Sequence, residues 1–483
     1  MNQSMDRRSH LKVMFIEPPK DIWFVMGEYL PPPYGIIQLA ASLEREIPNI
    51  QLEILDCNAE KVDWKKMEER IAASNPDVVA SASLATCNTY AVVKTLETAK
   101  RMAPKALTIT GGQHFTSTAQ DSLQLYPEID VIIRNEGEQT LAELVKAHQQ
   151  GVGFQNILGI SFRNGGNIVH NPSRPLIANL EDLPFPGYHL VKENMSKYHF
   201  SVMAGKRAPY ALIEGGRGCN HQCTFCTQWR HWQSCWRLKP AKRIADEMAY
   251  CNREFGSEMI WLTDDNFGTG QRPSEIADEI ISKQLPDVTW FVQARCDDII
   301  RNKDILPRLA KSGLRWVLLG VENSNPATLD YFKKGITPND AKTAVRLLQD
   351  NGIFAHAMVI IGNRKETHQS ILQLREFAND LDPDFIMFGI LTPFPGTEVY
   401  AEAERNKWIE DRNWNHYDMI HAIMPTETLS THQIQEELYG CYRGFYGSWN
   451  RRLNGLFSSN PMKRRTFRHM ATWGVMGKIK SMF

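Results

Sequence analysis

Several features that mark whole classes of protein are missing from this 483-residue sequence. No uninterrupted apolar run reaches the ~20 residues that a bilayer-spanning helix needs. The N-terminal segment MNQSMDRRSHLKVMFIE contains no apolar stretch of the signal-peptide type. The 55 Lys and Arg residues balance 55 Asp and Glu residues, so net charge gives no indication of nucleic-acid binding. We therefore expect a cytoplasmic protein that binds no nucleic acid.

Two nucleotide-binding motifs are also absent. No GxGxxG sequence follows the first strand-like run, and no P-loop occurs, which disfavours dinucleotides and nucleoside triphosphates as ligands. Nine cysteines are present, and in a reducing compartment they do not form a disulfide framework. They indicate metal or redox chemistry instead.

The first third of the sequence alternates apolar strand-like runs with amphipathic helical stretches. This alternation predicts a doubly wound parallel sheet over residues 10–150, in an α/β fold. Ligands of such sheets bind beyond the carboxyl ends of the strands. Residues 151–205 are interpreted as a linker that contains a β-hairpin with a Gly-Gly turn at Gly165 and Gly166.

A second alternating series covers residues 206–402. Its strand candidates are YALIEGG, EMIWLTDD, TWFVQAR, RWVLLGVE, AHAMVIIG and DFIMFGIL. They predict a partial (β/α)6 barrel with its active site at the carboxyl ends of the strands. Residues 403–483 predict a helical region, in which basic residues and no acidic residue follow Glu437. This basic tail is a solvated face, or it contacts an acidic substrate, an acidic partner or a membrane surface.

Three cysteines follow the first strand of the second series. Cys219, Cys223 and Cys226 have the spacing CxxxCxxC within GGRGCNHQCTFCTQWRHW. Zinc commonly takes four protein ligands in paired cysteines, and no second pair follows, although Cys235 or His221 is available as a fourth ligand. Three thiolates instead suit a 4Fe–4S cluster in which one iron has no protein ligand. That iron is open to the amino and carboxylate groups of S-adenosylmethionine (SAM).

The cysteine spacing, with Phe225 directly before the last cysteine, resembles that of the radical SAM superfamily. The resemblance implies a 4Fe–4S cluster, reductive cleavage of SAM to a 5′-deoxyadenosyl radical, and an external one-electron reductant such as ferredoxin or flavodoxin. It assigns no catalytic residue beyond the cofactor sites. The SAM contacts that it implies, mostly at strand ends, are Phe225, Asp264, Asp265, Gln293, Arg295, Glu322, Ile361 and Pro393.

Two turns in the first third resemble those of cobalamin-binding domains that are fused to radical SAM barrels. They are the GGQH sequence from Gly111 and the RNEGE sequence from Arg134. DxHxxG, which supplies a histidine ligand to cobalt in other cobalamin proteins, is absent, so His114 is not assigned as a cobalt ligand. The cobalamin contacts that this resemblance implies are Ser81, Ser83, Thr86, Asn88, Gly111, Gly112, His114, Glu136, Gly137 and Glu138.

Over nearly its whole length the sequence resembles the family of the anaerobic magnesium-protoporphyrin monomethyl ester oxidative cyclase and the cobalamin-dependent methylases. The shared segments are RGCNHQCTFCTQWRHW, KPAKRIADEM and YRGFY. FPGTEVY is more like the methylases, and TDDNF stands where a more acidic run is expected in the cyclase.

The resemblance therefore implies C-methylation of an unactivated carbon through a 5′-deoxyadenosyl radical and methylcobalamin. Oxidative cyclisation of a magnesium-protoporphyrin-type tetrapyrrole is the alternative, and a non-catalytic cobalamin-binding sensor is a more distant one. The substrate stays open between a small molecule, a tetrapyrrole and a protein side chain.

Overall fold

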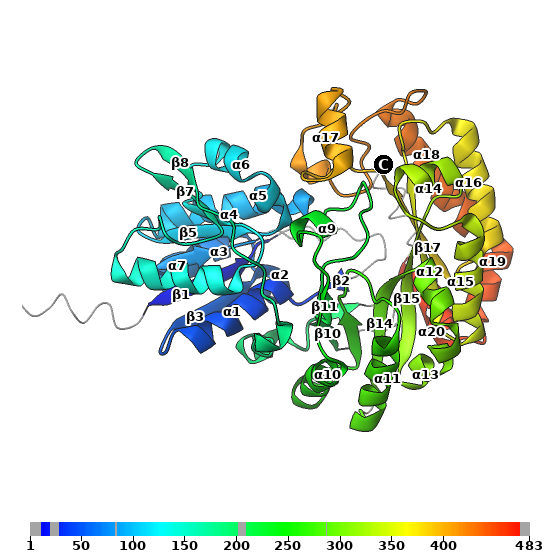
Figure 1. Ribbon diagram of the computed structural model, residues 1–483, viewed down its shortest axis with the longest axis horizontal. Coiled ribbons are helices and arrows are strands. Elements are labelled where there is room, and N and C mark those ends of the chain that lie inside the picture. Colours follow the sequence, from blue (N-terminus) through cyan, green and yellow to red (C-terminus); the bar gives the residue numbers. More distant parts are fainter. Residues whose placement is uncertain (1–10, 20–28, 83–84, 201–208, 286, 474–483) are drawn as a thin grey trace, which may run out of the picture. The chain divides into compact units, whose positions relative to one another are not determined.

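The structure is a computed structural model that describes residues 11–19, 29–82, 85–200, 209–285 and 287–473. The chain forms two compact units, which Figure 1 shows in the colours of the sequence. The first unit contains Met1–Asp21 and Pro33–Lys197, and the second contains Ile22–Pro32 and Tyr198–Phe483. Among the described residues, no helix is long and apolar enough to cross a membrane.

The first unit is built on a seven-stranded sheet in the order β3-β1-β4-β5-β6-β7-β8. The first five strands in this order pair in parallel, and β7 and β8 extend the sheet in antiparallel fashion. The predicted parallel sheet is confirmed, and the predicted hairpin forms its antiparallel edge. The strands are β1 (Lys12–Glu17), β3 (Gln51–Asp56), β4 (Val78–Ala80), β5 (Leu107–Gly111), β6 (Val131–Ile133), β7 (Ile160–Asn164) and β8 (Asn167–His170).

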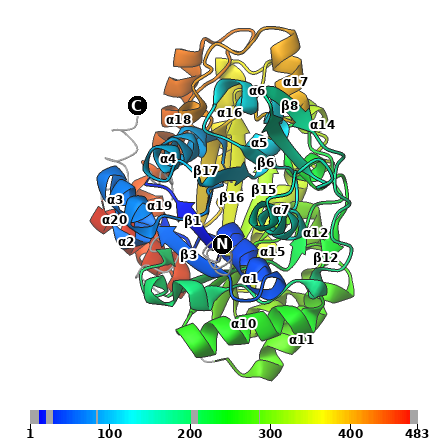
Figure 2. The same ribbon diagram turned by 90° about the vertical axis from the view of Figure 1, so that its left-hand side faces the viewer.

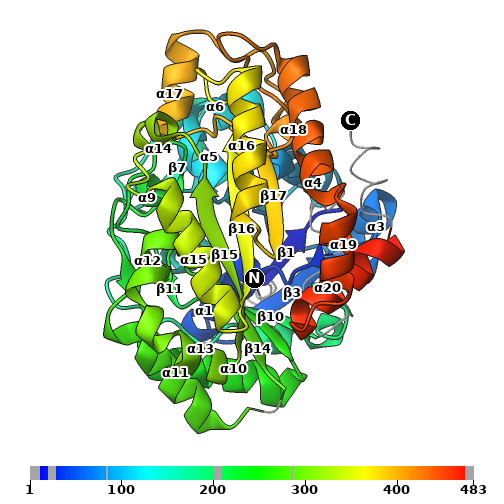
Figure 3. The same cartoon turned by 90° about the vertical axis from the view of Figure 1, so that its right-hand side faces the viewer.

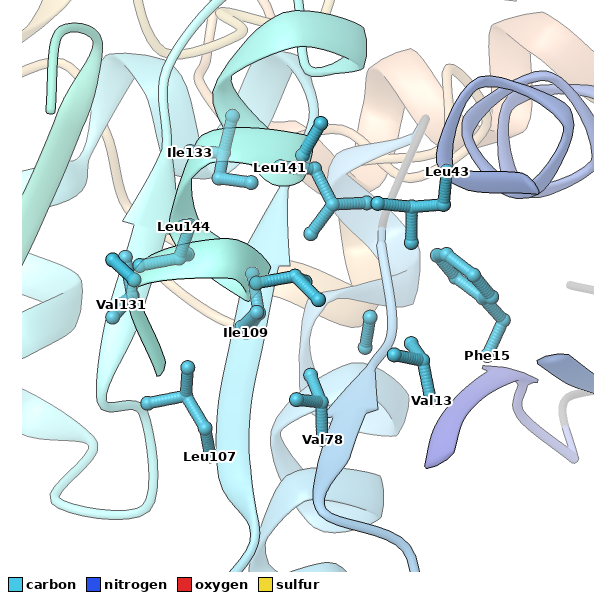
Figure 4. Close-up of a cluster of buried hydrophobic side chains, with 14 of the residues drawn as sticks. Val13, Phe15, Leu43, Val78, Leu107, Ile109, Val131, Ile133, Leu141 and Leu144 are labelled. Atoms are coloured by element: carbon cyan, nitrogen blue, oxygen red, sulfur yellow. The ribbon is translucent and has the colours of Figure 1, made fainter. Parts of the chain in front are cut away.

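Helices cover both faces of this sheet, which explains why its central strands are apolar throughout. Side chains alternate across a strand, so Phe15 and Met14 enter different cores. Phe15 lies in a core with Leu43 of α1 and Leu144 of α7 (Figure 4), two helices that lie side by side (Figure 2). The helices are α1 (Tyr34–Glu46), α2 (Cys57–Glu60), α3 (Trp64–Ser74), α4 (Thr89–Met102), α5 (Gln113–Ser117), α6 (Ala119–Leu125) and α7 (Glu138–Gln150).

The second unit contains a six-stranded sheet in the order β10-β13-β14-β15-β16-β17, in which all neighbours pair in parallel. The six predicted strands and their order are therefore confirmed. The strands are β10 (Tyr210–Ile213), β13 (Met259–Leu262), β14 (Thr289–Arg295), β15 (Leu314–Glu322), β16 (Phe354–Ile361) and β17 (Phe385–Ile390). The helices between them are α10 (Ala241–Phe255), α11 (Gln271–Lys283), α12 (Cys296–Arg301), α13 (Leu306–Lys311), α14 (Pro326–Tyr331), α15 (Pro338–Asp350) and α16 (His368–Leu381).

The C-terminal helices belong to this unit, and one of them covers the outer edge of β17 (Figure 3). The Tyr442 hydroxyl donates to the Phe388 carbonyl at 2.8 Å and accepts from the Phe388 N–H at 3.1 Å. Tyr446 makes the same pair of bonds to Ile386, at 2.7 and 2.9 Å. The two hydroxyls satisfy backbone groups that an edge strand would otherwise expose. The helices are α17 (Glu398–Arg405), α18 (Thr431–Tyr446), α19 (Trp449–Leu456) and α20 (Pro461–Trp473).

Two short antiparallel pairs complete the second unit. β2 (Tyr29–Leu30) pairs with β9 (His199–Phe200), and β11 (Gly216–Arg217) pairs with β12 (Arg237–Leu238). The second pair lies directly after the first barrel strand. It encloses the segment that carries the three cysteines and the short helix α9 (Gln228–His231).

Candidate active site

The cysteine-bearing loop is fixed at the carboxyl ends of the barrel strands. The Cys223 carbonyl accepts hydrogen bonds from the Cys226 N–H at 3.1 Å and from the Trp229 indole N–H at 3.0 Å. At the start of the loop, the Gly218 N–H donates to Asp265 Oδ2 at 3.0 Å, just after β13. Further along, the Thr224 hydroxyl donates to the Tyr331 carbonyl at 3.1 Å. The loop is therefore attached to the barrel at both of these points.

The three thiols lie in one loop and are buried or half-buried. Burial raises the pKa of each thiol, and that of Cys226 to about 12, while the three also interact electrostatically with one another. Within the described part of the chain, no three or more His, Cys, Asp or Glu side chains are grouped so that they could hold one metal ion. A 4Fe–4S cluster instead holds its thiolates on separate irons. The cationic groups of Lys334 and Arg295 act to lower the Cys223 thiol pKa, and Glu322 acts in the opposite direction.

Asp264, at the end of β13, is buried. Its Oδ2 pairs with Arg272 at 2.7 Å, and burial raises the pKa of its carboxyl group. Its Oδ1 makes no hydrogen bond of regular geometry among the described residues, but it lies beside Gly215, whose backbone lowers the carboxyl pKa. The Gln293 side chain, from β14, donates to the Asp264 carbonyl at 3.2 Å. The carboxylate of Asp264 is therefore held between Arg272 and the Gly215 backbone at the carboxyl end of the barrel.

Asp265 has a different environment from Asp264. It accepts the Gly218 N–H, and burial raises its carboxyl pKa to about 7. Arg272 donates to the Gly215 carbonyl at 2.9 Å in addition to its pair with Asp264. These contacts join the end of β13 to the cysteine loop. Sequence reasoning missed Arg272, because a single arginine at the start of a helix carries no distinguishing signal.

Glu322 and Arg295 are connected through Lys334, a residue that sequence reasoning also missed. Lys334 Nζ lies 2.6 Å from Glu322 Oε1, and its carbonyl accepts from Arg295. Arg295 also pairs with Asp297 at 2.9 Å. A Cβ atom on Gly320 would lie 2.5 Å from both Lys334 Nζ and Glu322 Oε1. Only glycine at position 320 leaves room for this buried pair.

The ends of β15 and β16 are tied together by a third missed residue, Glu366. Its carboxylate accepts from the Asn323 side chain at 2.8 Å and from the Gly362 N–H at 2.6 Å. Burial nevertheless raises its pKa to about 7. The sequence signal that could have identified Glu366 is a carboxylic acid in the turn directly after the strand-like run AHAMVIIG.

The remaining residues predicted to contact SAM lie around the same ends of the barrel strands. Phe225, in the cysteine loop, packs edge-on against Phe332 with ring centroids 5.0 Å apart. The Ile361 carbonyl accepts the Leu391 N–H at 2.8 Å, which extends the pairing of β16 with β17. Pro393 is buried just after β17. The structure thus gathers the eight predicted SAM contacts at the carboxyl end of the barrel, as the parallel register requires.

The predicted cobalamin residues follow three neighbouring parallel strands of the first unit. Ser81 comes after β4, the Gly111-Gly112 turn after β5, and the segment 134–138 after β6. Ser83 lies outside the described residues. The Ser81 hydroxyl already has a partner within the protein, because it donates a hydrogen bond to the Ile16 carbonyl at 2.8 Å. Thr86 and Asn88 form a short 3-10 turn before α4.

The Gly111-Gly112 turn needs glycine at both positions, since a Cβ atom on Gly111 would lie 2.9 Å from the Ile133 carbonyl oxygen. Gly112 has a φ of 93°, which only glycine adopts without strain. His114 is buried at the start of α5, and burial lowers its imidazole pKa to about 4, so the ring is neutral at physiological pH. The hydroxyl of Thr110, next to the turn, is buried without a hydrogen-bond partner among the described residues. Small glycines, an unsatisfied hydroxyl and a neutral ring fit the edge of a planar macrocycle such as a corrin.

The second predicted turn is held mainly by contacts within the unit. Glu136 Oε2 accepts the Ile177 N–H at 2.6 Å. A Cβ atom on Gly137 would lie 2.9 Å from the Leu39 side chain. Glu138 is buried at the first position of α7. The contacts of Glu136 and Gly137 position the turn.

Comparison with known proteins assigns both units. Residues 213–378 match the Radical SAM superfamily, and residues 25–145 match the B12 binding domain. An uncharacterised methyltransferase of Pyrococcus horikoshii is 29% identical over 440 residues, which cover 90% of this chain and 92% of that protein. The anaerobic magnesium-protoporphyrin IX monomethyl ester cyclase of Cereibacter sphaeroides is 29% identical over 420 residues, covering 86% of this chain and 67% of that protein. The solved structure of the radical SAM methyltransferase TsrM from Kitasatospora setae shares the fold, with a TM-score of 0.72, 16% identity and coverage of 97% and 99%.

Fold and site together define a radical SAM barrel and a B12-binding domain in a single chain. The chain belongs to the cobalamin-binding radical SAM family, and over most of its length it is similar to a methyltransferase and to the magnesium-protoporphyrin cyclase. It is an enzyme, and its cofactors are a 4Fe–4S cluster, SAM and cobalamin.

Proposed function

We propose that this enzyme methylates an unactivated carbon of its substrate. The observation that carries the proposal is the match to a methyltransferase over 90% of this chain and 92% of that relative. When bound, the reduced cluster and SAM supply a 5′-deoxyadenosyl radical that removes a substrate hydrogen, and methylcobalamin supplies the methyl group. The protein's task is to hold cofactors and substrate in the reacting geometry, because a radical attacks whatever lies closest.

In this proposal the cysteine loop holds the cluster through Cys219, Cys223 and Cys226. Asp264 offers its carboxylate to the amino group of SAM. Glu322 offers its carboxylate to the ribose hydroxyls, and Lys334 fixes its position from 2.6 Å away. The further SAM contacts that we propose are Phe225, Asp265, Gln293, Arg295, Ile361 and Pro393.

For cobalamin we propose the carboxyl edge of the sheet in the first unit. The buried, neutral His114 contacts the corrin and is not a ligand of cobalt. Glu136 positions the turn after β6, because its carboxylate accepts the hydrogen bond of the Ile177 N–H. The other proposed contacts are Ser81, Ser83, Thr86, Asn88, Gly111, Gly112, Gly137 and Glu138.

An external one-electron donor, such as ferredoxin or flavodoxin, completes the proposal. The chemistry needs an electron for each reductive cleavage of SAM, and no further redox motif occurs in the sequence. The cytoplasm is the compartment that we propose, because its thiols stay reduced and free for cluster assembly.

A second candidate is oxidative ring closure on a magnesium-protoporphyrin-type tetrapyrrole. It is favoured by the 29% identity to the Cereibacter sphaeroides cyclase over 420 residues. In that reaction the product gains no methyl group from SAM. Following the methyl group of SAM with an isotope label therefore distinguishes the two candidate reactions.

Isotope feeding tests the proposal in cells. A host strain that lacks its own copy is complemented with the protein or with its Cys223→Ala variant, and is fed methionine with a deuterated methyl group. Methylation predicts a metabolite or protein residue that carries the intact deuterated methyl only in the strain with the unaltered protein. A new metabolite that has lost hydrogen or gained oxygen, without label, would support the cyclase reaction instead.

A further inference from the structure

The helix α19 carries an apolar stripe that faces solvent. Trp449, Leu453 and Phe457 follow one another at four-residue intervals, so they lie on one side of the helix and its C-terminal cap. Their exposed fractions are 73%, 48% and 76%. Three large apolar side chains in a row on one exposed helix are unusual, because a soluble surface normally carries such residues singly.

The opposite side of α19 is already packed. α19 and α20 lie side by side (Figure 3), and at their contact a Cβ atom on Gly455 would overlap the ring of Phe467. We call the two helices the C-terminal hairpin. Lys463 pairs with Asp384 at 2.8 Å, and Asn460 donates to the Gly352 carbonyl at 3.2 Å. The exposed stripe is therefore not the face by which the hairpin attaches to the barrel.

The hairpin lies away from the candidate active site of its own unit. Asp384 directly precedes β17, and Gly352 lies just before β16, so both anchors are at the amino ends of barrel strands. The cysteine loop and the proposed SAM residues are at the carboxyl ends. The stripe is thus not explained by the reaction.

The charge of the hairpin is of one sign. From Trp449 to Trp473 the sequence has no acidic residue. Two of its cations, Arg451 and Lys463, pair with aspartates of the barrel. Four arginines form no ion pair in the described part of the chain: Arg452, Arg464, Arg465 and Arg468. Arg465 and Arg468 are exposed, and Arg452 lies over the Trp449 ring at 5.5 Å.

We propose that the C-terminal hairpin binds the surface of a membrane that contains anionic lipids. A tryptophan, a leucine and a phenylalanine on one side of a helix insert at the boundary between headgroups and acyl chains. Arg452, which lies over the Trp449 ring, and the exposed Arg465 and Arg468 of α20 bind lipid phosphates and raise the local concentration at an anionic surface. This proposal stands independently of the reaction, since it uses neither cofactor site.

Two other binding partners for the exposed stripe fit these observations less well than a membrane surface does. A second copy of the chain in a two-fold contact would bring like-charged hairpins together. A protein partner normally covers ~800 Å² on each side, whereas a stripe along an eight-residue helix is about 12 Å long. A membrane needs only the inserted side chains and nearby positive charge.

Vesicle co-sedimentation of the anaerobically reconstituted full-length protein tests the proposal. The vesicles are phosphatidylcholine alone or phosphatidylcholine with phosphatidylglycerol. The test variants are Trp449→Ser/Leu453→Ser/Phe457→Ser and Arg465→Gln/Arg468→Gln. Matched controls are Leu125→Ser, which removes an exposed leucine of the first unit, and Lys303→Gln/Lys311→Gln, which removes two exposed charges of the barrel.

We expect binding to the anionic vesicles, little binding to phosphatidylcholine alone, and weakening as salt screens the arginines. The triple variant should lower the partition coefficient about tenfold or more, and the arginine variant several-fold, while both controls leave it unchanged. Absence of binding to anionic vesicles, or a triple variant that binds like the unaltered protein, would overturn the proposal.

Two further measurements assign the stripe to another occupant if the proposal fails. Sedimentation velocity of the unaltered protein and the triple variant reports self-association through the stripe. Binding of polyglutamate that the triple variant loses would indicate an acidic protein partner. Either result, without vesicle binding, contradicts a membrane surface as the occupant.

Discussion

Lys334 Nζ lies 2.6 Å from Glu322 Oε1, and both side chains are buried. Glu322 has a φ of 64° at the end of β15, a left-handed backbone conformation that a residue with a side chain rarely adopts. The register of β15 against β16 shifts at the same point. The strand end is therefore distorted where its carboxylate meets the lysine, which is where we propose that the ribose of SAM binds.

Replacing Lys334 by Met should destabilise the second unit. The variant leaves the Glu322 carboxylate buried without its counter-ion, which costs about 3–5 kcal/mol in comparable pairs. The control is Lys333→Met, because Lys333 is half exposed and its pair with Glu398 is a surface one, worth less than about 1 kcal/mol. Urea unfolding measures both, and equal stabilities of the two variants would contradict the buried-pair account.

Gly218→Ala should prevent cluster assembly. Gly218 has a φ of 85°, and a Cβ atom there would overlap the carbonyl oxygen of Cys235. The control is Gly256→Ala, at the C-terminal cap of α10, where φ is 67° but no atom lies within 4 Å of the added Cβ. We expect the control to lose only about 1 kcal/mol of stability and to keep its iron. Iron and sulfide analysis would refute the prediction by finding four irons in the Gly218→Ala variant.

Glu366 should make the stability of the second unit depend on pH. Burial raises its pKa from 4.5 to about 7 in the folded protein, so the folded state holds this proton more tightly than the unfolded state. The stabilisation is complete below pH 4.5 and is lost as the pH rises through about 7. The free energy of unfolding should fall by up to about 3 kcal/mol over this range. Urea unfolding of the apo-protein at several pH values measures it, and Glu366→Gln should remove this part of the slope. Identical slopes in the two proteins would exclude Glu366 as the source.

The hydrogen bonds from the two tyrosines of α18 to β17 should contribute more to the free energy of unfolding than surface hydrogen bonds do. Tyr442→Phe and Tyr446→Phe each leave a backbone N–H and a carbonyl of a buried strand without their partner, at a cost of about 1–3 kcal/mol per variant. Hydrogen exchange of the Ile386 and Phe388 amides should quicken locally. Unchanged exchange at these two amides would mean that α18 covers the strand edge by packing alone.

The barrel and the cysteine loop are predictable from sequence because their signals are local. Each of the six strands is a largely apolar run, and their parallel order follows from the intervening helices. The cysteine spacing lies within eight residues, from Cys219 to Cys226. Neither inference needs knowledge of a distant contact.

The supporting residues of the site could not be found in this way. Lys334 comes from the loop after α14, and nothing in its neighbourhood marks it as the partner of Glu322. Arg272 forms an ion pair with Asp264 Oδ2. The sequence identified this acid as a candidate SAM contact, but it did not reveal that an arginine pairs with one of its oxygens. Tyr442 and Tyr446 occur in a recognisable helix, but their bonds to β17 depend on tertiary packing. Long-range partners of this kind are set by the fold.

The most direct test of the central claim follows the methyl group of SAM in the purified enzyme. The protein is reconstituted anaerobically with iron, sulfide and cobalamin, and is given a one-electron reductant and SAM with a ¹³C-labelled methyl group. Mass spectrometry then measures labelled methylcobalamin, S-adenosylhomocysteine and 5′-deoxyadenosine. Cys223→Ala is the test variant, and Cys235→Ala, which removes an exposed thiol outside the trio, is its matched control.

Our account predicts labelled methylcobalamin and S-adenosylhomocysteine in the unaltered enzyme, together with 5′-deoxyadenosine. It predicts that 5′-deoxyadenosine disappears in Cys223→Ala and persists in Cys235→Ala. Formation of 5′-deoxyadenosine with no label on cobalamin would contradict methyl transfer and favour the cyclase reaction. Cleavage of SAM that survives Cys223→Ala would contradict the cluster assignment itself.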